Sequence, residues 1–256
     1  MSNTPVLHLL HVQPDTRLLA TWMVRYRTQD EGEALHGLLR AAFGTQAPQP
    51  FRYLDEQRGL LAYTALDGAA LEQATALADP QAARTLGLGA GHGHSGYRLR
   101  LFPSVWPQGK QLGFEVRVRP TVRGAKGEHD AFLQAVAAAG GRDGASVSRE
   151  AVYADWLRAQ LAERPGQPRQ PWQGAVELLD VQLSAFGRSR IQRHSQAGAA
   201  TARKGRTIDG PDATLTGHLR VIDPVAFAHL LARGIGRHRS YGFGMLLLHR
   251  ADEQIG

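Results

Sequence analysis

The sequence predicts an α+β fold in which a β-α-β-β-α-β order of elements occurs twice. The 256 residues are 43% hydrophobic, which is enough for a packed core. Short strand patterns alternate with helical patterns over residues 1–107, and a second series follows Pro103, Pro107 and Gly109. This order is typical of a ferredoxin-like domain, so we expect two tandem ferredoxin-like domains, residues 1–107 and 108–256.

In the first half, helical spacing and turn signals define the elements. Leu35, Leu38, Leu39 and Phe43 recur at the spacing of one helix face, and Gln57-Arg58-Gly59 is typical of a hairpin turn. The expected elements are a strand over 6–12, a helix over 29–43, strands over 51–56 and 60–66, a helical region over 69–86 that Pro80 interrupts, and a strand over 97–102.

The second half opens on a clearly alternating strand. Phe114, Val116 and Val118 occupy one face of it, and Arg117 and Arg119 the other. The expected elements are this strand over 112–119, helices over 128–139 and 149–163, strands over 175–186 and 213–222, a helix over 224–232 capped by Asp223, and a strand over 241–249. The segment between the two central strands is expected to loop out as a hairpin.

The two halves differ in charge. Residues 1–107 carry nine Lys and Arg against nine Asp and Glu, whereas residues 108–256 carry 21 against 14 and so the whole net charge of +7. Residues 187–207 hold no acidic residue and six cationic ones, namely Arg188, Arg190, Arg193, Arg203, Lys204 and Arg206. This basic insert predicts a polyanionic partner, with nucleic acid the first candidate. A high-GC genome would explain why 27 of the 30 cations are Arg, but not their clustering.

The composition also excludes several classes of site. The chain has no cysteine, which rules out a disulfide framework, a thiolate zinc site and a thiol nucleophile. The apolar run over 6–12 is too short to span a bilayer and lacks a basic leader, so we expect a cytoplasmic soluble protein with no membrane partner. With no carboxylate cluster either, we expect no metal and no cofactor, and any chemistry rests on histidine and arginine.

The sharpest local feature is the glycine-rich segment, residues 234–244 (GIGRHRSYGFG). Glycines let a backbone approach phosphate closely, and Arg237 and Arg239 are placed to clamp it. The segment is not a Walker A loop, because it lacks the Lys-Ser/Thr ending and follows a helix. The predicted contacts are Gly234, Gly236, Arg237, His238 and Arg239. The alternative interpretation is a helix C-cap at Gly234 followed by a turn into an edge strand.

A second glycine motif, Gly91-x-Gly93-x-x-Gly96, precedes a strand pattern and not a helix, so it fails as a dinucleotide fingerprint. His92 and His94 within it lack a third ligand at a suggestive spacing, and a linker is the preferred interpretation.

His36 lies at the margin of the apolar stripe of the helix over 29–43. Glu33 and Arg40 share its face, three residues before it and four after it. Such a trio can hold an imidazole whose pKa is near neutral beside a cation that stabilises an anionic oxygen. A half-buried helix histidine without a chemical role is the alternative.

Several segments resemble the CasE-type CRISPR RNA endoribonucleases. The C-terminal residues 215–226 (LTGHLRVIDPVA) and 234–248 (GIGRHRSYGFGMLLL) carry the most specific similarity. Residues 113–122 (GFEVRVRPTV) resemble the family's strand with an Arg-x-Arg-Pro-like ending, and residues 34–39 (ALHGLL) resemble its first helix, where a Leu-His pair carries the catalytic histidine. The segments occur in the family's order over most of the chain.

The resemblance implies tandem ferredoxin-like domains and metal-independent cleavage of CRISPR precursor RNA at the 3′ base of the repeat stem-loop. The products would carry a 2′,3′-cyclic phosphate and a 5′-hydroxyl. The enzyme would stay on the mature guide RNA with other subunits of a CRISPR surveillance complex. His36 inherits the role of general acid or base, and Arg25, Arg27 and Arg40 become candidate stabilisers of the phosphorane charge.

The chain departs from the family at one position. Relatives often have Tyr three residues before the histidine, where this sequence has Glu33, and Tyr26 is the candidate substitute. Arg117 and Arg119 are predicted to line the RNA path, although plain solvent exposure explains them equally well. Membership of a related type IV CRISPR group, in which the catalytic residues are mainly arginines, stays open as an alternative. The runner-up function is a non-catalytic RNA-hairpin-binding subunit, and a third is a nucleotide-using enzyme.

Overall fold

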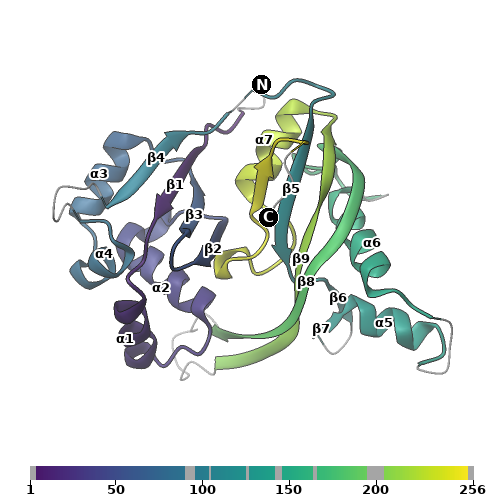
Figure 1. Ribbon diagram of the computed structural model, residues 1–256, viewed down its shortest axis with the longest axis horizontal. Coiled ribbons are helices and arrows are strands. Elements are labelled where there is room, and N and C mark those ends of the chain that lie inside the picture. Colours follow the sequence, from purple (N-terminus) through teal and green to yellow (C-terminus); the bar gives the residue numbers. More distant parts are fainter. Residues whose placement is uncertain are drawn as a thin grey trace.

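Each half of the chain forms a four-stranded antiparallel sheet with helices packed on one face (Figure 1). The computed structural model describes residues 4–89, 96–103, 105–124, 127–141, 146–163, 166–194 and 205–252. The strand orders are β2-β3-β1-β4 and β10-β5-β9-β8. In both sheets the first strand of that half lies between its third and fourth strands, which is the ferredoxin-like order. The predicted fold class, two tandem ferredoxin-like domains, is confirmed.

The first sheet and its helices come from residues 8–101. The elements are β1 (His8–Val12), α1 (Thr16–Tyr26), α2 (Glu31–Phe43), the 3₁₀ turn η1 (Gly44–Gln46), β2 (Phe51–Asp55), β3 (Gly59–Thr64), α3 (Gly68–Ala76), α4 (Pro80–Leu86) and β4 (Tyr97–Leu101). Pro80 divides the expected helical region as predicted, because it begins α4 at the first helical position, where a missing N–H costs nothing. Helix α1 was not predicted. Its N-cap is Asp15, which accepts from the amides of Arg17 and Leu18.

The second sheet and its helices come from residues 111–249. The elements are β5 (Gln111–Val118), β6 (Thr121–Gly124), β7 (Gly127–Asp130), α5 (Ala131–Ala138), α6 (Arg149–Leu161), β8 (Val176–His194), β9 (Gly205–Val221), α7 (Pro224–Arg233), the 3₁₀ turn η3 (Arg239–Tyr241) and β10 (Leu246–His249). Asp223 caps α7 through the amides of Val225 and Ala226, as predicted.

Several boundaries of the second half were wrong. The helix expected from residue 128 begins at Ala131, because residues 127–130 pair with residues 121–124 as a small hairpin. The final strand begins at Leu246 instead of residue 241, because Gly242 and Gly244 have φ of 81° and 78°, outside the strand region. Strands β8 and β9 extend beyond the predicted ends at residues 186 and 213, because their ladder continues as far as His194 and Gly205. The remainder of the expected hairpin, residues 195–204, lies outside the described part of the chain.

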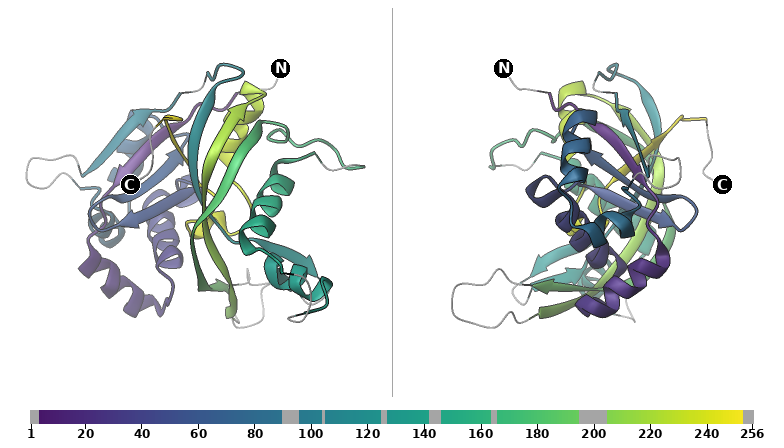
Figure 2. Two further views of the ribbon diagram at one scale, coloured as in Figure 1. Left: turned by 45° about the vertical axis from the view of Figure 1, so that its right-hand side comes forward. Right: turned by 90° about the vertical axis from the view of Figure 1, so that its left-hand side faces the viewer.

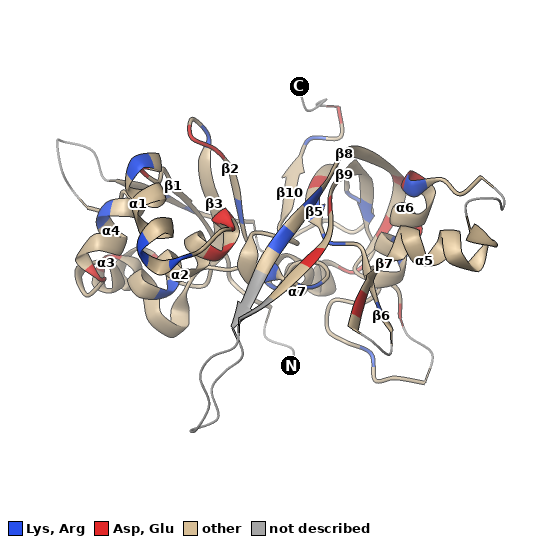
Figure 3. Ribbon diagram, turned by 90° about the horizontal axis from the view of Figure 1, so that it is seen from below, with Lys and Arg blue, Asp and Glu red and all other residues tan. Residues whose placement is uncertain are grey.

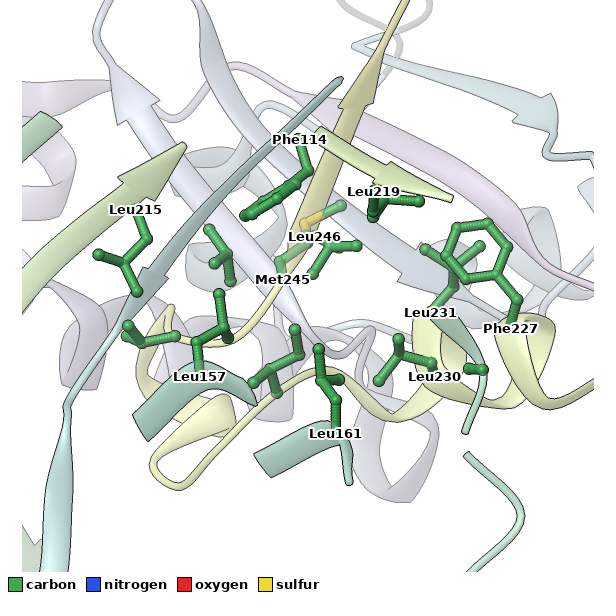
Figure 4. Close-up of a cluster of buried hydrophobic side chains, with 14 of the residues drawn as sticks. Phe114, Leu157, Leu161, Leu215, Leu219, Phe227, Leu230, Leu231, Met245 and Leu246 are labelled. Atoms are coloured by element: carbon green, nitrogen blue, oxygen red, sulfur yellow. The ribbon is translucent and has the colours of Figure 1, made fainter. Parts of the chain in front are cut away.

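Each sheet buries one face against its own helices. Leu10, Val12 and Leu60 pack on Leu35 and Leu38 of α2 in the first core. The second core, shown in Figure 4, joins β5 and β9 to α6 and α7; it includes Phe114, Leu157, Leu161, Leu215, Leu219, Phe227, Leu230, Leu231, Met245 and Leu246. Figure 2 shows the two sheets beside each other, with helices packed against each of them.

The second core also takes side chains from the first sheet, and this joins the two halves. Leu9, Tyr63 and Phe102 belong to it, and the hydroxyl of Tyr63 donates to the carbonyl of Leu246 at 2.9 Å. Arg52 of β2 pairs with Glu115 of β5 at 3.4 Å. The halves therefore pack on each other through both apolar and charged contacts. No helix in the described part of the chain is long and apolar enough to cross a membrane.

Candidate active site and nucleic-acid interface

Helix α2 fixes the position of His36. Asp30 caps the helix by accepting from the amide of Glu33 at 2.9 Å, and Gly44, with φ of 58°, ends it. Leu35 and Leu38 are fully buried against the first sheet. His36 therefore lies at the edge of the buried face, half-buried, as the apolar spacing predicts.

The glycine-rich segment folds as a closed turn between α7 and β10. Gly234 is the C-cap of α7, as the alternative interpretation of this segment proposes. The amide of Ile235 donates to the carbonyl of Gly244 at 2.8 Å, and the amide of Gly244 donates to the carbonyl of Arg117 at 2.7 Å. Side chains at Gly234 and Gly244 would collide with this backbone, so the glycines permit the closure. The segment is thereby fixed to β5.

His36 and the glycine-rich segment meet. The ring centroids of His36 and Tyr241 lie 5.5 Å apart with an interplanar angle of 53°. Burial, and then the charge of Arg40, lowers the pKa of His36 below its usual value of 6.5. The imidazole is therefore mostly neutral at neutral pH, the form that accepts a proton. Arg40 itself is exposed, one turn after His36.

A carboxylate from the β6–β7 hairpin holds the other side of the glycine-rich segment. Glu128 accepts from Nε2 of His238 at 2.8 Å and pairs with Nε of Arg237 at 3.2 Å. Burial alone would raise the pKa of Glu128, but the His238 hydrogen bond and the Arg237 charge lower it. Burial also lowers the pKa of His238 despite the carboxylate, so a neutral imidazole donates to an ionised Glu128. Sequence patterns do not indicate a role for Glu128, because its partners Arg237 and His238 lie far along the chain.

A basic hollow opens beside this turn. Its volume is about 530 Å³, and Gln49, Pro50, Ala232, Arg233, Gly236, Arg237, His238, Arg239 and Ser240 line it. Internal contacts position two of its arginines: Arg239 donates to the carbonyl of Arg233 at 2.8 Å, and the guanidinium of Arg233 lies 3.7 Å from the Trp172 ring centre. The predicted contacts Gly236, Arg237, His238 and Arg239 therefore face one space.

The described residues of the basic insert, 187–194 and 205–207, belong to the paired strands β8 and β9, which curve beneath α2 in Figure 1. Arg188 and Arg190 are exposed on β8. Arg188 pairs with Asp209 of the facing strand at 3.3 Å. Asp209 lies just beyond residues 187–207, so the basic insert obtains an acidic partner from outside its own sequence. Figure 3 shows cationic segments both on α2 and on the strands that lead into the hairpin.

Arg117 and Arg119 bind the base of this hairpin. Arg117 makes a bidentate ion pair with Asp212 of β9, with Nε–Oδ1 at 2.8 Å and Nη2–Oδ2 at 2.5 Å. Arg119 is 1% exposed and donates to Oγ of Ser189 at 3.0 Å and to the carbonyl of Ile208 at 3.2 Å. The interpretation of Arg119 as a solvent-exposed strand residue is therefore wrong. Its guanidinium binds both strands of the hairpin.

The candidates on α1 lie apart from these contacts. Arg25 donates to the side chain of Gln81 in α4 at 2.6 Å. Tyr26 is 51% exposed and packs on Trp22, with ring centroids 4.2 Å apart. Glu33, in contrast, is 6% exposed within the first half.

Some predicted residues lie outside the described part of the chain. Arg203, Lys204, His92 and His94 are among them, and of Arg193 and Arg206 only the backbone is described. Within the described residues, no group of three or more His, Asp or Glu side chains is arranged to hold a metal ion.

Comparison with protein families identifies the chain. The profile of the family described as CRISPR associated protein matches residues 7–250. The chain belongs to this family. No curated protein sequence matches it.

Solved structures support the fold of this CRISPR associated protein. CRISPR endoribonuclease Cse3 bound to a 19-nucleotide RNA aligns with a TM-score of 0.54 at 17% identity, over 95% of this chain and 99% of that one. Thermus thermophilus Cse3 bound to an RNA representing a pre-cleavage complex aligns with a TM-score of 0.52 at 17% identity, over 95% of this chain and 98% of that one. A chain of a CRISPR RNA-guided surveillance complex in a pre-nicking state aligns with a TM-score of 0.53 at 17% identity, over 95% and 99%.

Proposed function

We propose that this protein is a metal-independent endoribonuclease that cleaves CRISPR precursor RNA at the 3′ base of the repeat stem-loop. The observation that carries the proposal is the meeting of His36 with the glycine-rich segment through Tyr241. A neutral imidazole thereby lies against a segment that also lines a basic hollow. The fold is shared with an endoribonuclease bound to RNA, which supports the same activity here.

The proposed reaction is an attack by a ribose 2′-hydroxyl on the adjacent phosphorus. His36 removes the proton of the 2′-hydroxyl as general base, since its lowered pKa leaves it unprotonated at neutral pH. The new bond from O2′ to phosphorus closes a 2′,3′-cyclic phosphate, the bond from phosphorus to O5′ breaks, and O5′ takes up a proton to leave as a 5′-hydroxyl. The protonated imidazole is then able to return that proton.

Cations near His36 stabilise the charge that develops on the phosphorane oxygens. Arg40 is exposed, and its field reaches the imidazole. Arg237 is exposed on the glycine-rich segment beside His238. We assign the phosphate-stabilising role first to Arg40, ahead of Arg25, whose guanidinium binds Gln81. Arg237 comes second, because Glu128 already pairs with its guanidinium at 3.2 Å.

The β8–β9 hairpin supplies the grip on the RNA stem. An A-form stem is recognised through its shape and backbone more than through its base edges, and arginine suits phosphate oxygens. Arg188 and Arg190 are exposed along β8 and fit this role. A grip separate from the cleavage site would let the protein stay on the mature guide RNA, as a subunit of a CRISPR surveillance complex.

The test is cleavage of a repeat hairpin RNA in EDTA under single-turnover conditions. A matched RNA with a 2′-deoxy sugar at the cleavage site must stay intact. His36→Ala should slow cleavage by about 100-fold or more with little change in RNA affinity. The control is His229→Ala, which removes a half-buried histidine of α7 outside the site.

Three results would each contradict one part of the proposal. RNA binding without product would contradict the enzymatic activity and favour the runner-up function, a non-catalytic hairpin-binding subunit. Cleavage of the 2′-deoxy RNA would contradict attack by the 2′-hydroxyl. If His36→Ala cleaves as fast as the unchanged protein, His36 is not the base.

A further inference from the structure

The contact between His36 and Tyr241 joins two parts of the chain that belong to different sheets. His36 lies on α2, which packs on the first sheet, and Tyr241 ends the 3₁₀ turn η3 beside the second sheet. His238 and Gly242 bracket this turn in left-handed conformation, with φ of 59° and 81°. A non-glycine residue is strained there, so the surrounding contacts must hold the turn.

The backbone of Tyr241 presses on the same helix face as its ring. A Cβ added at Gly32 would overlap the carbonyl oxygen of Tyr241. Gly32 lies one turn before His36 on α2, so the two residues share a face. Tyr241 thus contacts α2 at two successive turns, through its backbone at Gly32 and through its ring at His36.

The opposite side of the turn is held independently. Glu128 binds Arg237 and His238, and the side chain of Arg239 binds the carbonyl of Arg233. With both ends of η3 fixed, the phenol ring has a defined place against the imidazole.

We propose that Tyr241 is a positioning residue for His36: its ring holds the imidazole and keeps water from one face of it. The inference rests on the proposed function for its catalytic meaning, but the contact itself can be measured without RNA. Burial is the largest cause of the lowered pKa of His36, and the ring contributes to that burial. Arg40, on α2, is the charge that also lowers it, and Tyr241 is the titratable group that faces the imidazole from η3.

The proposal separates the ring of Tyr241 from its hydroxyl. Tyr241→Phe keeps the ring and should leave both the His36 titration and the cleavage rate within about twofold of the unchanged protein. Tyr241→Ala removes the ring. It should raise the pKa of His36 towards its usual value and slow single-turnover cleavage by about 10- to 100-fold, with RNA affinity unchanged. Tyr241→Leu keeps an apolar side chain of similar bulk, so its His36 pKa and its cleavage rate should lie between those of Tyr241→Phe and Tyr241→Ala.

The experiment combines a histidine NMR titration of the whole protein with single-turnover kinetics at saturating RNA. The His36 signal is assigned by its loss in His36→Gln. The matched control is Tyr97→Ala, which removes a half-buried tyrosine of β4 outside the site. Thermal melts show whether each variant is folded. If Tyr241→Ala does not fold, Tyr241→Leu replaces it in both measurements.

The possible outcomes are distinct. If Tyr241→Ala leaves both the titration and the rate unchanged, the ring does not position His36. If Tyr241→Phe is as slow as Tyr241→Ala, the hydroxyl takes part in the chemistry and the positioning role is overturned. A shifted titration in Tyr241→Ala, with no cleavage by the unchanged protein, would uphold the contact and refute the proposed function alone.

Discussion

Arg117 of β5 and Asp212 of β9 form a bidentate ion pair at the base of the basic hairpin. Their side chains are 28% and 16% exposed, and the Arg117 guanidinium also lies 4.5 Å from the Phe243 ring centre. Burial alone would lower the pKa of Arg117, but the hydrogen bonds and charge of Asp212 raise it. An arginine that sequence analysis assigned to RNA is thus already bound within the protein.

This pair should show strong coupling. In a double-mutant cycle, Arg117→Gln and Asp212→Asn are expected to interact by about 1–3 kcal/mol, because removing one partner leaves the other charge half-buried and unpaired. Urea denaturation of the four proteins measures the coupling. The exposed pair Arg158–Asp155 of α6 is the matched control, with coupling near zero. Independent effects of the two substitutions would show that the ion pair does not stabilise the hairpin base.

The exposed arginines of the hairpin should act on RNA affinity and leave stability unchanged. Replacing Arg188 and Arg190 with Ala removes up to two phosphate contacts, so the slope of log affinity against log salt should fall by about 1–2. Filter binding of a repeat hairpin RNA over a range of salt concentrations measures it. Arg158→Ala removes an exposed cation outside the proposed path and should leave the slope unchanged. An unaltered slope for Arg188→Ala/Arg190→Ala would show that these two arginines do not contact the RNA phosphates.

Most of the order of elements was predictable from the sequence because the helix signals are local. Asp30, Asp79 and Asp223 all cap helices through their carboxylates, and the apolar spacing around Leu35 and Leu38 identified the buried face of α2. Helix α1 was missed although its signals are local as well: Asp15 caps it, and its buried residues Leu19 and Trp22 lie three positions apart. The β6–β7 hairpin was missed because its strands have four residues each and little alternation.

The candidate site was predicted only where a residue's role is local. His36 stands out on its own helix, whereas Tyr241 and Glu128 acquire their partners through the packing of distant segments. Arg119 shows the opposite failure. Charged residues are rarely buried, so the alternation over residues 112–119 predicted exposure for the Arg119 side chain, which the hairpin encloses.

Stability should fall in mild acid. Burial, with the charge of Arg40, lowers the pKa of His36, and burial lowers that of His238. Below about pH 6.5 the unfolded chain therefore binds protons at these positions before the folded protein does. The free energy of unfolding then decreases as the pH falls from about 6.5 towards the lowered folded-state pKa values, and it levels off below them. Urea denaturation between about pH 7.5 and 5 measures this slope. The double variant His36→Gln/His238→Gln should flatten it, and an equally steep slope in that variant would contradict the assignment.

Gly32→Ala should loosen the contact between α2 and η3. Inside a helix, alanine is normally more stabilising than glycine. At position 32, however, the added Cβ would overlap the carbonyl oxygen of Tyr241, and a backbone atom cannot rotate out of the way. We expect a net loss of about 1–3 kcal/mol in the free energy of unfolding. Gly68→Ala is the matched control, because Gly68 begins α3 and a Cβ there meets no atom within 4 Å. That change should be neutral or slightly stabilising. If Gly32→Ala is as stable as Gly68→Ala, the close approach of the two segments is wrong; if it is destabilised, the same variant should also raise the pKa of His36, because the Tyr241 ring would move away with its backbone.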